Sequence, residues 1–370
     1  MRGNIINLSE ARQINEITFK EWTSRLRPQA GDLLLAREAP VGPVVRIPVE
    51  ENVAPGQRTV LIRPNALIVD PRYMYYYLIS PQVQAELMAR AEGSTVAHLN
   101  VADIRNFPVE VPPELPQQLA IAEVLGALDD KIAANDRAAS LAIELSDSLF
   151  RRVIERGHGD SVTIKQLAEK RLLEFSDGYR TKRAELDATG LRILRAGDIR
   201  DNRVFSSGPD FVAEEYRAKI GGKASAVNDV VITTKGTVGR VAVVLAGVEG
   251  NVYSPQLCYI RVSGPDVIAP SYVAAWLRSA NARGQMANVM HKSDMAPYIN
   301  LKDVGALEMP WGDEAIRNGL SSRLTVLMNY FHALGAENGK LSDTRDELLP
   351  LLMSGKLRVK DAEQIVEKIV

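Results

Sequence analysis

The stretch from Pro116 to Arg156 reads PQQLAIAEVLGALDDKIAANDRAASLAIELSDSLFRRVIER. It contains no proline after Pro116 and only one glycine, Gly126. Its apolar residues recur at spacings of three and four, which predicts one long helix with a single apolar stripe. The stripe consists of Ile121, Val124, Leu125, Leu128, Ile132, Ala139, Leu145, Leu149 and Val153. At about 1.5 Å per residue the helix would extend on the order of 60 Å, longer than a small domain. It therefore needs a partner to cover its stripe.

Composition narrows the class of protein. A chain of 370 residues is too long for one ordinary core and suggests about two to four units. The net charge of −1 means that any contact with nucleic acid must use local basic patches or basic partner subunits. The single cysteine, Cys258, cannot form an internal disulfide, and no apolar run has membrane-spanning length. We expect a cytoplasmic protein without membrane contact.

The sequence contains an internal repeat of two copies. Residues 1–112 are short apolar runs separated by turn residues, followed by a helical stretch, and the same order returns after Gly157. Matching residues lie 197 to 200 positions apart, so chance is an unlikely cause. The matches include Asp32 with Asp229, Arg63 with Arg261, Pro71 with Pro270, Asn100 with Asn300 and Asp103 with Asp303.

A second helical stripe follows the second copy, over 313–353. Gly335 and Gly339 weaken this helix, each by about 1 kcal/mol relative to alanine. The two stripes can cover each other as an antiparallel pair. The fold class expected is α+β, with two globular domains of mixed sheet and short helices separated by two long helices that form an antiparallel coiled coil. The expected boundaries are 1–112 and 158–310 for the domains, and 113–157 and 311–370 for the helices.

The two copies are unequal. Nothing before Gly3 corresponds to residues 163–196, so the first domain is expected to lack roughly its opening thirty to forty residues. Three explanations stay open: a start that is placed late, completion by another chain, or completion by the far terminus.

Motifs for catalysis are missing from the sequence. There is no GxxxxGK[ST], HExxH or GxSxG, and His98, His158, His291 and His332 have no metal-ligand spacing. We expect neither an enzyme nor a metal site.

Two polar turns in the second copy are candidates for binding nucleic acid. In the loop 233–240, Lys235, Thr237 and Arg240 stand among glycines, and the backbone N–H groups with the cationic tips suit a phosphate. The alternative is a polar hairpin turn. The second turn carries Tyr179 and Arg180, an aromatic ring and a guanidinium for base or phosphate contact. Here the alternative is a solvated face of mixed charge.

The motif around Pro116, Gln117-Gln118, Ile121-Ala122, Leu125, Leu128-Asp129 and Ile132 resembles the first conserved region of the DNA specificity (S) subunit of type I restriction-modification systems. The ending from Leu351 to Val359 is similar to the closing helix and tail of that family. Gly31 to Leu35, Gly236 to Arg240 and Gly93-Ser94-Thr95 resemble its target-recognition domains.

The resemblance implies a non-catalytic subunit. Each of two target-recognition domains would read one half of a split site in double-stranded DNA. The two helices would set the distance between the half-sites and dock two methyltransferase (modification) subunits, which restriction subunits can join. S-adenosylmethionine, ATP and Mg²⁺ would be used by these partners, with no cofactor in this chain. A rival interpretation is a degenerate specificity subunit that serves as a scaffold and docks methyltransferase subunits without reading DNA.

Two sets of site residues follow from this interpretation. The DNA contacts expected are Tyr179, Arg180, Lys235, Thr237, Arg240, Lys292 and Ser293 in the second domain, with Arg37, Ser94 and Thr95 in the first. The partner-binding residues expected on the helices are Gln118, Ile121, Leu125, Leu128, Ile132, Leu324, Leu327 and Phe331.

Overall fold

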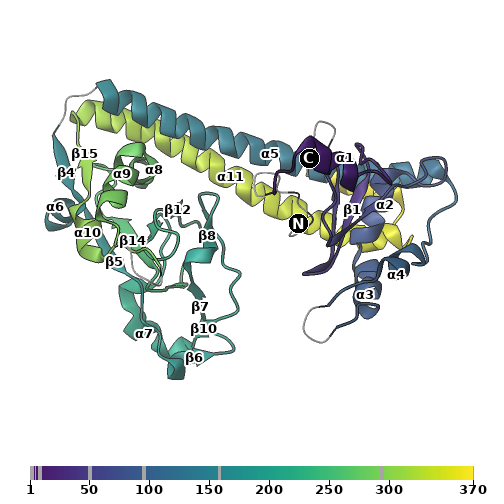
Figure 1. The fold of residues 1–370 in the computed structure, drawn as a ribbon. Coiled ribbons are helices and arrows are strands. Elements are labelled where there is room, and N and C mark those ends of the chain that lie inside the picture. The colour runs from purple at the N-terminus through teal and green to yellow at the C-terminus, as the bar shows by residue number, and fades with distance from the viewer. Residues whose placement is uncertain are drawn as a thin grey trace. The chain divides into compact units, whose positions relative to one another are not determined.

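The computed structural model describes Asn4, Ile6 and residues 11–48, 52–93, 97–156, 160–291 and 296–369, with only the backbone for 154–156 (Figure 1). The chain divides into two compact units. Unit 1 is Met1–Asn135 with Glu337–Val370, and unit 2 is Asp136–Ala336. Each unit contains a sheet and short helices, and two long helices supply segments to both. The expected α+β class is confirmed.

Unit 1 is built on a three-stranded antiparallel sheet in the order β2-β1-β3. Helix α2 begins where Asp70 caps the N–H groups of Arg72 and Tyr73, with Pro71 in the first turn. Its aromatic side chains Tyr73 and Tyr76 are buried in the same core as Leu33 and Leu35 of β1. The elements are α1 Glu16–Trp22, β1 Leu33–Arg37, β2 Val41–Arg46, β3 Thr59–Ile62, α2 Pro71–Ile79, α3 Pro81–Ala89 and α4 Val101–Arg105.

Unit 2 contains the matching sheet with one more strand, in the order β12-β11-β14-β5. A smaller sheet, β13-β7-β10-β6, and the hairpin β8-β9 complete the domain. The strands are β4 Ser161–Thr163, β5 Leu173–Asp177, β6 Leu186–Asp187, β7 Leu191–Leu194, β8 Ile199–Arg200, β9 Arg203–Val204, β10 Phe211–Val212, β11 Val230–Thr233, β12 Val241–Val243, β13 Val252–Tyr253, β14 Leu257–Val262 and β15 Glu308–Pro310. The helices are α6 Ile164–Glu169, α7 Arg217–Ile220, α8 Pro270–Arg278, α9 Ala280–Val289 and α10 Leu301–Ala306.

The internal repeat is a repeat of structure. Strands β2-β1-β3 of unit 1 have the same order and antiparallel pairing as β12-β11-β14 of unit 2. Helix α4 begins where Asp103 accepts the N–H of Asn100, at 3.2 Å. Helix α10 begins with the matching bond from Asn300 to Asp303, at 2.9 Å. The cap residues at matched positions therefore start matched helices.

A buried ion pair also recurs in both units. Asp32 pairs with Arg63 at 2.6 Å, and Asp229 pairs with Arg261 at 2.7 Å. Both aspartates are almost fully buried, with 2% and 0% of the side chain exposed. A buried carboxylate is tolerated when it is paired and hydrogen-bonded, so each arginine is required by its aspartate. Asp32 and Asp229 immediately precede β1 and β11. Arg63 follows β3 and Arg261 lies in β14, so each ion pair joins the corresponding parts of two neighbouring strands.

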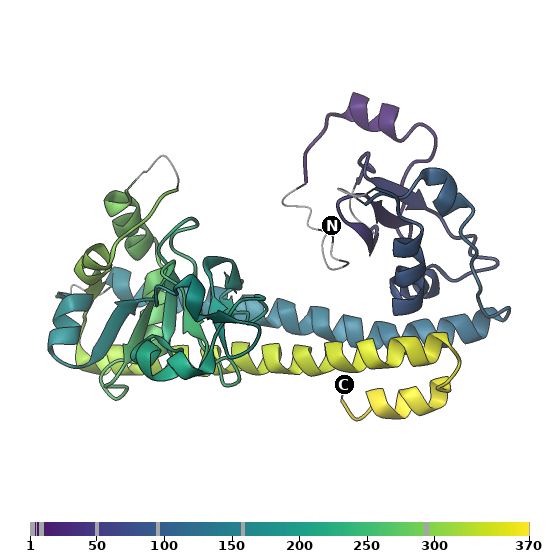
Figure 2. The ribbon, with the colours of Figure 1, turned by 90° about the horizontal axis from the view of Figure 1, so that it is seen from below.

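The far terminus contributes to unit 1. Helix α11 (Glu314–Met353) is followed closely by Gly355, which adopts the left-handed conformation that favours glycine, and then by α12 (Val359–Val366) (Figure 2). Ala362 and Val366 of α12 are buried in the unit 1 core. In unit 2, α6 follows α5 and buries Ile164 and Leu167 in the unit 2 core. The packing of α12 in the unit 1 core supports one of the three explanations for the unequal copies, completion of unit 1 by the far terminus. Among the described residues of unit 1, no strand corresponds to β5.

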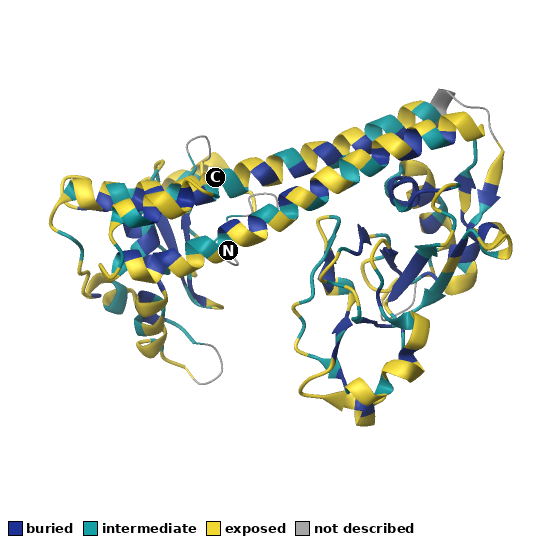
Figure 3. Cartoon of the chain, turned by 180° about the vertical axis from the view of Figure 1, so that it is seen from behind, coloured by how far each residue is buried: buried dark blue, intermediate teal, exposed yellow. Residues whose placement is uncertain are grey.

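Helices α5 (Leu115–Arg156) and α11 (Glu314–Met353) pair in antiparallel fashion within each unit. In unit 1, Asp129 contacts Arg345 at 2.8 Å, and Asn135 contacts Asn338 at 2.9 Å, so numbering rises along one helix as it falls along the other. In unit 2, Ala139 packs with Phe331 and Leu334. Buried positions recur along both helices (Figure 3). Most of the apolar stripe of α5 is thus covered by the chain itself, whereas Leu145 remains exposed.

The glycines of α11 have different surroundings. A Cβ at Gly339 would meet nothing within 4 Å, and one at Gly335 would lie 3.4 Å from the guanidinium of Arg203, an ordinary contact. Gly335 thus leaves room for Arg203, which stacks over Phe331 at 4.9 Å and pairs with Asp136 at 3.6 Å.

Replacing Gly339 by alanine should raise the free energy of unfolding by about 1 kcal/mol, because alanine restricts the unfolded backbone more than glycine does. Gly335→Ala should also stabilise, since its methyl group fits against Arg203. Urea unfolding followed by circular dichroism measures both. Gly305→Ala is the control: a Cβ there would lie 3.0 Å from the Phe175 ring, so no gain is expected. An unchanged midpoint for Gly339→Ala would mean that α11 is not helical through this position in solution.

Candidate nucleic-acid interface

The loop between β11 and β12 is held by its own hydrogen bonds. The Thr233 hydroxyl donates to the Thr237 carbonyl and accepts the Arg240 backbone N–H at 2.9 Å. The backbone N–H of Gly239 donates to Thr233 at 2.9 Å, and that of Gly236 donates to Pro297 at 3.0 Å. Both glycines have positive φ, +77° and +91°, so this turn requires them.

This geometry corrects one part of the phosphate hypothesis. The backbone N–H groups of Gly236, Gly239 and Arg240 already donate to other groups of unit 2 and cannot also cradle a phosphate. The side chains of Lys235, Thr237 and Arg240 are exposed, so contact with DNA from this loop would come from side-chain groups.

The matching loop of unit 1 has different chemistry. The Arg37 guanidinium donates to the Leu99 carbonyl at 3.0 Å and to the Gln57 carbonyl at 3.2 Å. Arg37 therefore stabilises its own domain, and two of its guanidinium nitrogens are already engaged in hydrogen bonds. Four other expected contacts, Ser94, Thr95, Lys292 and Ser293, lie outside the described residues.

The turn after β5 presents Arg180 to solvent, whereas the hydroxyl of Tyr179 is turned inward. This hydroxyl donates to Glu185 at 3.1 Å, and the Lys219 ammonium donates to the same carboxylate at 2.7 Å. The Lys182 backbone N–H and Lys219 lower the pKa of Glu185 to about 2, so the carboxylate stays charged. Tyr179 is thus a structural residue through its hydroxyl, and Arg180 is the free group of the pair.

Tertiary folding places Arg240 in a cleft with three arginines that are distant in sequence. The cleft has a volume of about 360 Å³ and lies in unit 2. Its charged lining residues are Arg200, Arg240, Arg278, Arg283, Asp147 and Asp201. Sequence analysis did not select Arg278 or Arg283 as contacts, because nothing in helices α8 and α9 by themselves indicates that they face this loop.

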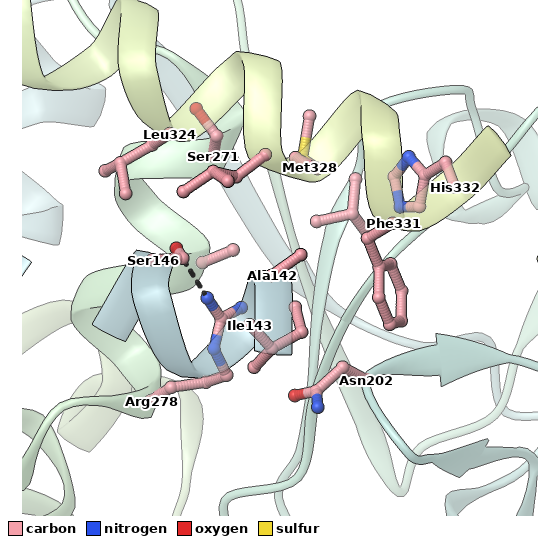
Figure 4. A pocket seen from close by; sticks show the side chains of 13 residues that line it. Ala142, Ile143, Ser146, Asn202, Ser271, Arg278, Leu324, Met328, Phe331 and His332 are labelled. Atoms are coloured by element: carbon pink, nitrogen blue, oxygen red, sulfur yellow. Dashed lines mark hydrogen bonds between the residues drawn. The ribbon is translucent and has the colours of Figure 1, made fainter. Parts of the chain in front are cut away.

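A second, smaller hollow lies between α5, α8 and α11 of unit 2 (Figure 4). Arg278 reaches across it and donates to the Ser146 hydroxyl at 3.3 Å. Burial, together with nearby Arg203, lowers the pKa of His332 to about 4, so this histidine is neutral at pH 7. The hollow has a volume of only about 20 Å³, which leaves room for roughly one water molecule. It is a packing seam between helices and not a ligand site.

The helix residues expected to bind partners lie mostly inside this chain. Gln118 is fully buried: its amide donates to the Pro112 and Ile68 carbonyls at 2.6 and 3.1 Å and accepts the Asp70 N–H at 2.9 Å. The others are buried or half-buried in the chain's own helix packing: Ile121, Leu125, Leu128, Ile132, Leu324, Leu327 and Phe331. These side chains are largely covered by the chain's own packing, and their use in docking stays a prediction. Large apolar side chains that remain exposed on the two long helices within unit 2 include Leu141, Leu145, Ile316, Val326 and Tyr330.

Within the parts of the chain that the structure describes, no cluster of three or more histidine, cysteine or carboxylate groups is suited to a metal. None of the helices described has the length and apolar character needed to span a membrane.

Comparison with known proteins shows which family this chain resembles. Residues 3–144 match the type I restriction modification DNA specificity domain. The specificity subunit of the type I restriction enzyme MjaVIII from Methanocaldococcus jannaschii is 19% identical over 312 residues, covering 80% of this chain and 72% of that protein. The chain is similar to the specificity subunits of type I restriction-modification systems, and residues 3–144 match their DNA specificity domain. Specificity subunits are non-catalytic, which agrees with the missing catalytic motifs.

Two further proteins are similar to this chain. The specificity subunit of the HindI enzyme from Haemophilus influenzae is 26% identical over 140 residues, covering 37% of this chain and 28% of that protein. The crystal structure of the S subunit from M. genitalium superposes with a TM-score of 0.52 at 17% identity, covering 88% of this chain and 83% of that one. At this identity the structure shows a shared fold, and the expected fold of a specificity subunit is confirmed.

The turn that presents Arg180 depends on Gly178. A Cβ at this position would lie 2.1 Å from the Ser254 carbonyl oxygen and 2.3 Å from that of Tyr253. Gly178→Ala should therefore lower the free energy of unfolding of unit 2, by about 1–3 kcal/mol or more, because the backbone must move. Thermal unfolding of the purified chain measures this. Gly197→Ala, whose Cβ would meet nothing within 4 Å, is the control and should be neutral. Equal stability of the two variants would show that the turn is not closely packed.

Proposed function

We propose that this specificity subunit reads a bipartite target in double-stranded DNA, with one half-site assigned to each unit. The repeated framework with divergent loops is the observation that supports this most directly. The strand order, the buried aspartate–arginine pair and the helix starts are the same in both units. Such a pair of scaffolds can present two different reading surfaces to one duplex.

The loops that differ are those suited to base contact. Unit 2 presents Lys235, Thr237 and Arg240 where unit 1 has Glu38, Ala39 and Pro40 between its first two strands. Lysine and arginine bind guanine edges or phosphates, whereas the unit 1 loop cannot make these contacts. The two units would therefore select different half-sites. Arg180, Lys292 and Ser293 of unit 2 and Ser94 and Thr95 of unit 1 stay in the proposed contact set.

The helix pair would serve two tasks in the complex. Its length would set the gap between the half-sites, and its outer face would dock two methyltransferase subunits, with restriction subunits joining them. Leu145 and Tyr330 each precede a buried position, Ser146 and Phe331, by one residue. In an antiparallel pair such positions share one side of the pair, so they form an apolar face suited to a partner. S-adenosylmethionine, ATP and Mg²⁺ would act in the partner subunits, in the cytoplasm.

A second candidate is a degenerate specificity subunit that docks methyltransferase subunits without reading DNA through unit 1. It is favoured by the engaged guanidinium of Arg37 and by the missing counterpart of β5 in the described part of unit 1. In that case unit 2 would be the only reader, and the recognised sequence would be a single half-site.

Sequencing of methylated bases separates the candidates. A host that expresses this chain with its methyltransferase subunit should acquire methylation at a split motif with a fixed gap, because two linked readers impose two half-sites. A host with the methyltransferase alone is the control and should show no such motif. A continuous motif would favour the single-reader candidate, and a motif that persists without this chain would contradict both.

Lengthening the helix pair should change the gap and leave the half-sites unchanged. The insertion must be matched, with four residues after Ala138 of α5 and four after Gly335 of α11, because the helices cover each other. Four residues add about 6 Å, close to two base-pair steps of about 3.4 Å. We expect the gap in the methylated motif to grow by about one to two base pairs. Altered half-site bases with a constant gap would contradict the spacer role.

A further inference from the structure

The cleft of unit 2 has an excess of positive charge that its own residues do not balance. Arg278 pairs with Asp147 at 2.9 Å, which neutralises that carboxylate. Asp201 then faces three arginines, Arg200, Arg240 and Arg283. The lining therefore carries a net charge of about +2, and such a concave surface concentrates positive potential.

Two of these guanidinium groups are oriented by contacts that leave most of their donors available. Arg240 donates one N–H to the Ile199 carbonyl at 3.4 Å. Arg200 stacks over the Phe205 ring at 4.2 Å, a contact that uses the face of the guanidinium and leaves its edge N–H groups free to bind an oxyanion. Because planar guanidinium forks match the oxygens of a phosphate, this arrangement suits one phosphate group.

The hairpin that carries Arg200 is anchored on the helices of unit 2. In the β8-β9 ladder Arg200 lies opposite Arg203, and Asp201 and Asn202 form the turn with φ of +51° and +58°. Arg203 points to the helices, where it stacks over Phe331 and pairs with Asp136. One arginine thus anchors the hairpin and the other lines the cleft, which fixes the position of Arg200 before any ligand binds.

The residue of unit 1 that matches Arg283 is not basic. Arg283 of α9 corresponds to Gln84 of α3, at the repeat offset of α2 and α8. The Gln84 amide donates to the Leu78 carbonyl at 2.7 Å and to the Gly42 carbonyl at 2.9 Å, so its N–H groups are used by the backbone of unit 1. The described part of unit 1 therefore lacks a counterpart of the Arg283 guanidinium.

We propose that the cleft formed by Arg200, Arg240 and Arg283 binds a phosphate group of the DNA backbone and holds unit 2 on the duplex without reading bases. The proposal rests on the proposed function for its ligand. Backbone phosphate and a free phosphate compound offer the same oxygens, so the experiment distinguishes these sources. A backbone contact positions the protein equally well on any sequence, and its loss should weaken all duplexes alike.

The test uses the complex of this chain with its methyltransferase subunit. Binding to the methylated motif and to a scrambled duplex is measured from about 50 to about 200 mM salt. Arg283→Gln should weaken binding to both duplexes by the same factor and reduce the slope of log affinity against log salt by about 1. Arg200→Gln should act similarly, and Arg283→Lys should keep most of the slope because it keeps the charge. Arg323→Gln, an exposed arginine of α11 that does not line the cleft, is the matched control and should leave the slope unchanged.

A second arm follows thermal unfolding of the complex with inorganic phosphate at constant ionic strength. A saturable rise in the unfolding temperature that Arg283→Gln abolishes, with an unchanged DNA slope, would assign the phosphate site to a free ligand and overturn the backbone contact. An unchanged slope with no phosphate effect would overturn the phosphate site altogether. Failure of the proposed function is a different result: the wild-type complex would show no preference for the motif, while the slope on scrambled DNA would still report the cleft. Arg283 is exposed on α9, so its variants should fold, and circular dichroism checks this.

Discussion

The pairing of α5 with α11 is the constraint on which the rest of the structure depends. A helix of 42 residues with an apolar stripe is not stable in water by itself, and the stripe must be buried. The chain buries it with its own second helix, although the two helices are separated by a whole domain. The division between the units falls inside both helices, at Asn135 and Ala336, so each unit is completed by segments from both. Folding of either unit therefore requires residues from distant parts of the sequence.

Stability and recognition use different residues of the repeated domain. The buried aspartate–arginine pair and the helix caps are the same in both units because removing either partner of a buried pair would leave an uncompensated charge. The loops between the first strands are exposed, and their side chains carry little of the packing energy. Divergence of these loops costs little stability, which lets two copies of one framework acquire different surfaces.

In unit 2 the β8-β9 hairpin contributes both to packing and to the proposed recognition surface. Arg203 binds the helices through the Phe331 ring and the Asp136 carboxylate, beside Gly335. These two contacts position the hairpin against α11 and α5.

The sequence by itself determined the elements with local or periodic causes. The limits of α5 followed from its spacing of apolar residues and the prolines before it, and the repeat predicted two related domains and a covering helix. The motif from Pro116 to Ile132 carried the resemblance to the family, and its Gln118 joins three backbone groups through a buried amide. Only the tertiary structure decided which polar groups are free. Arg37 and Tyr179 looked like contacts, but their donors are used internally. Arg278 and Arg283 had no local signal, since a cleft forms where a loop, a hairpin and two helices meet. Hydrogen-bond partners and charge clusters depend on distances across the fold, and sequence spacing does not contain those distances.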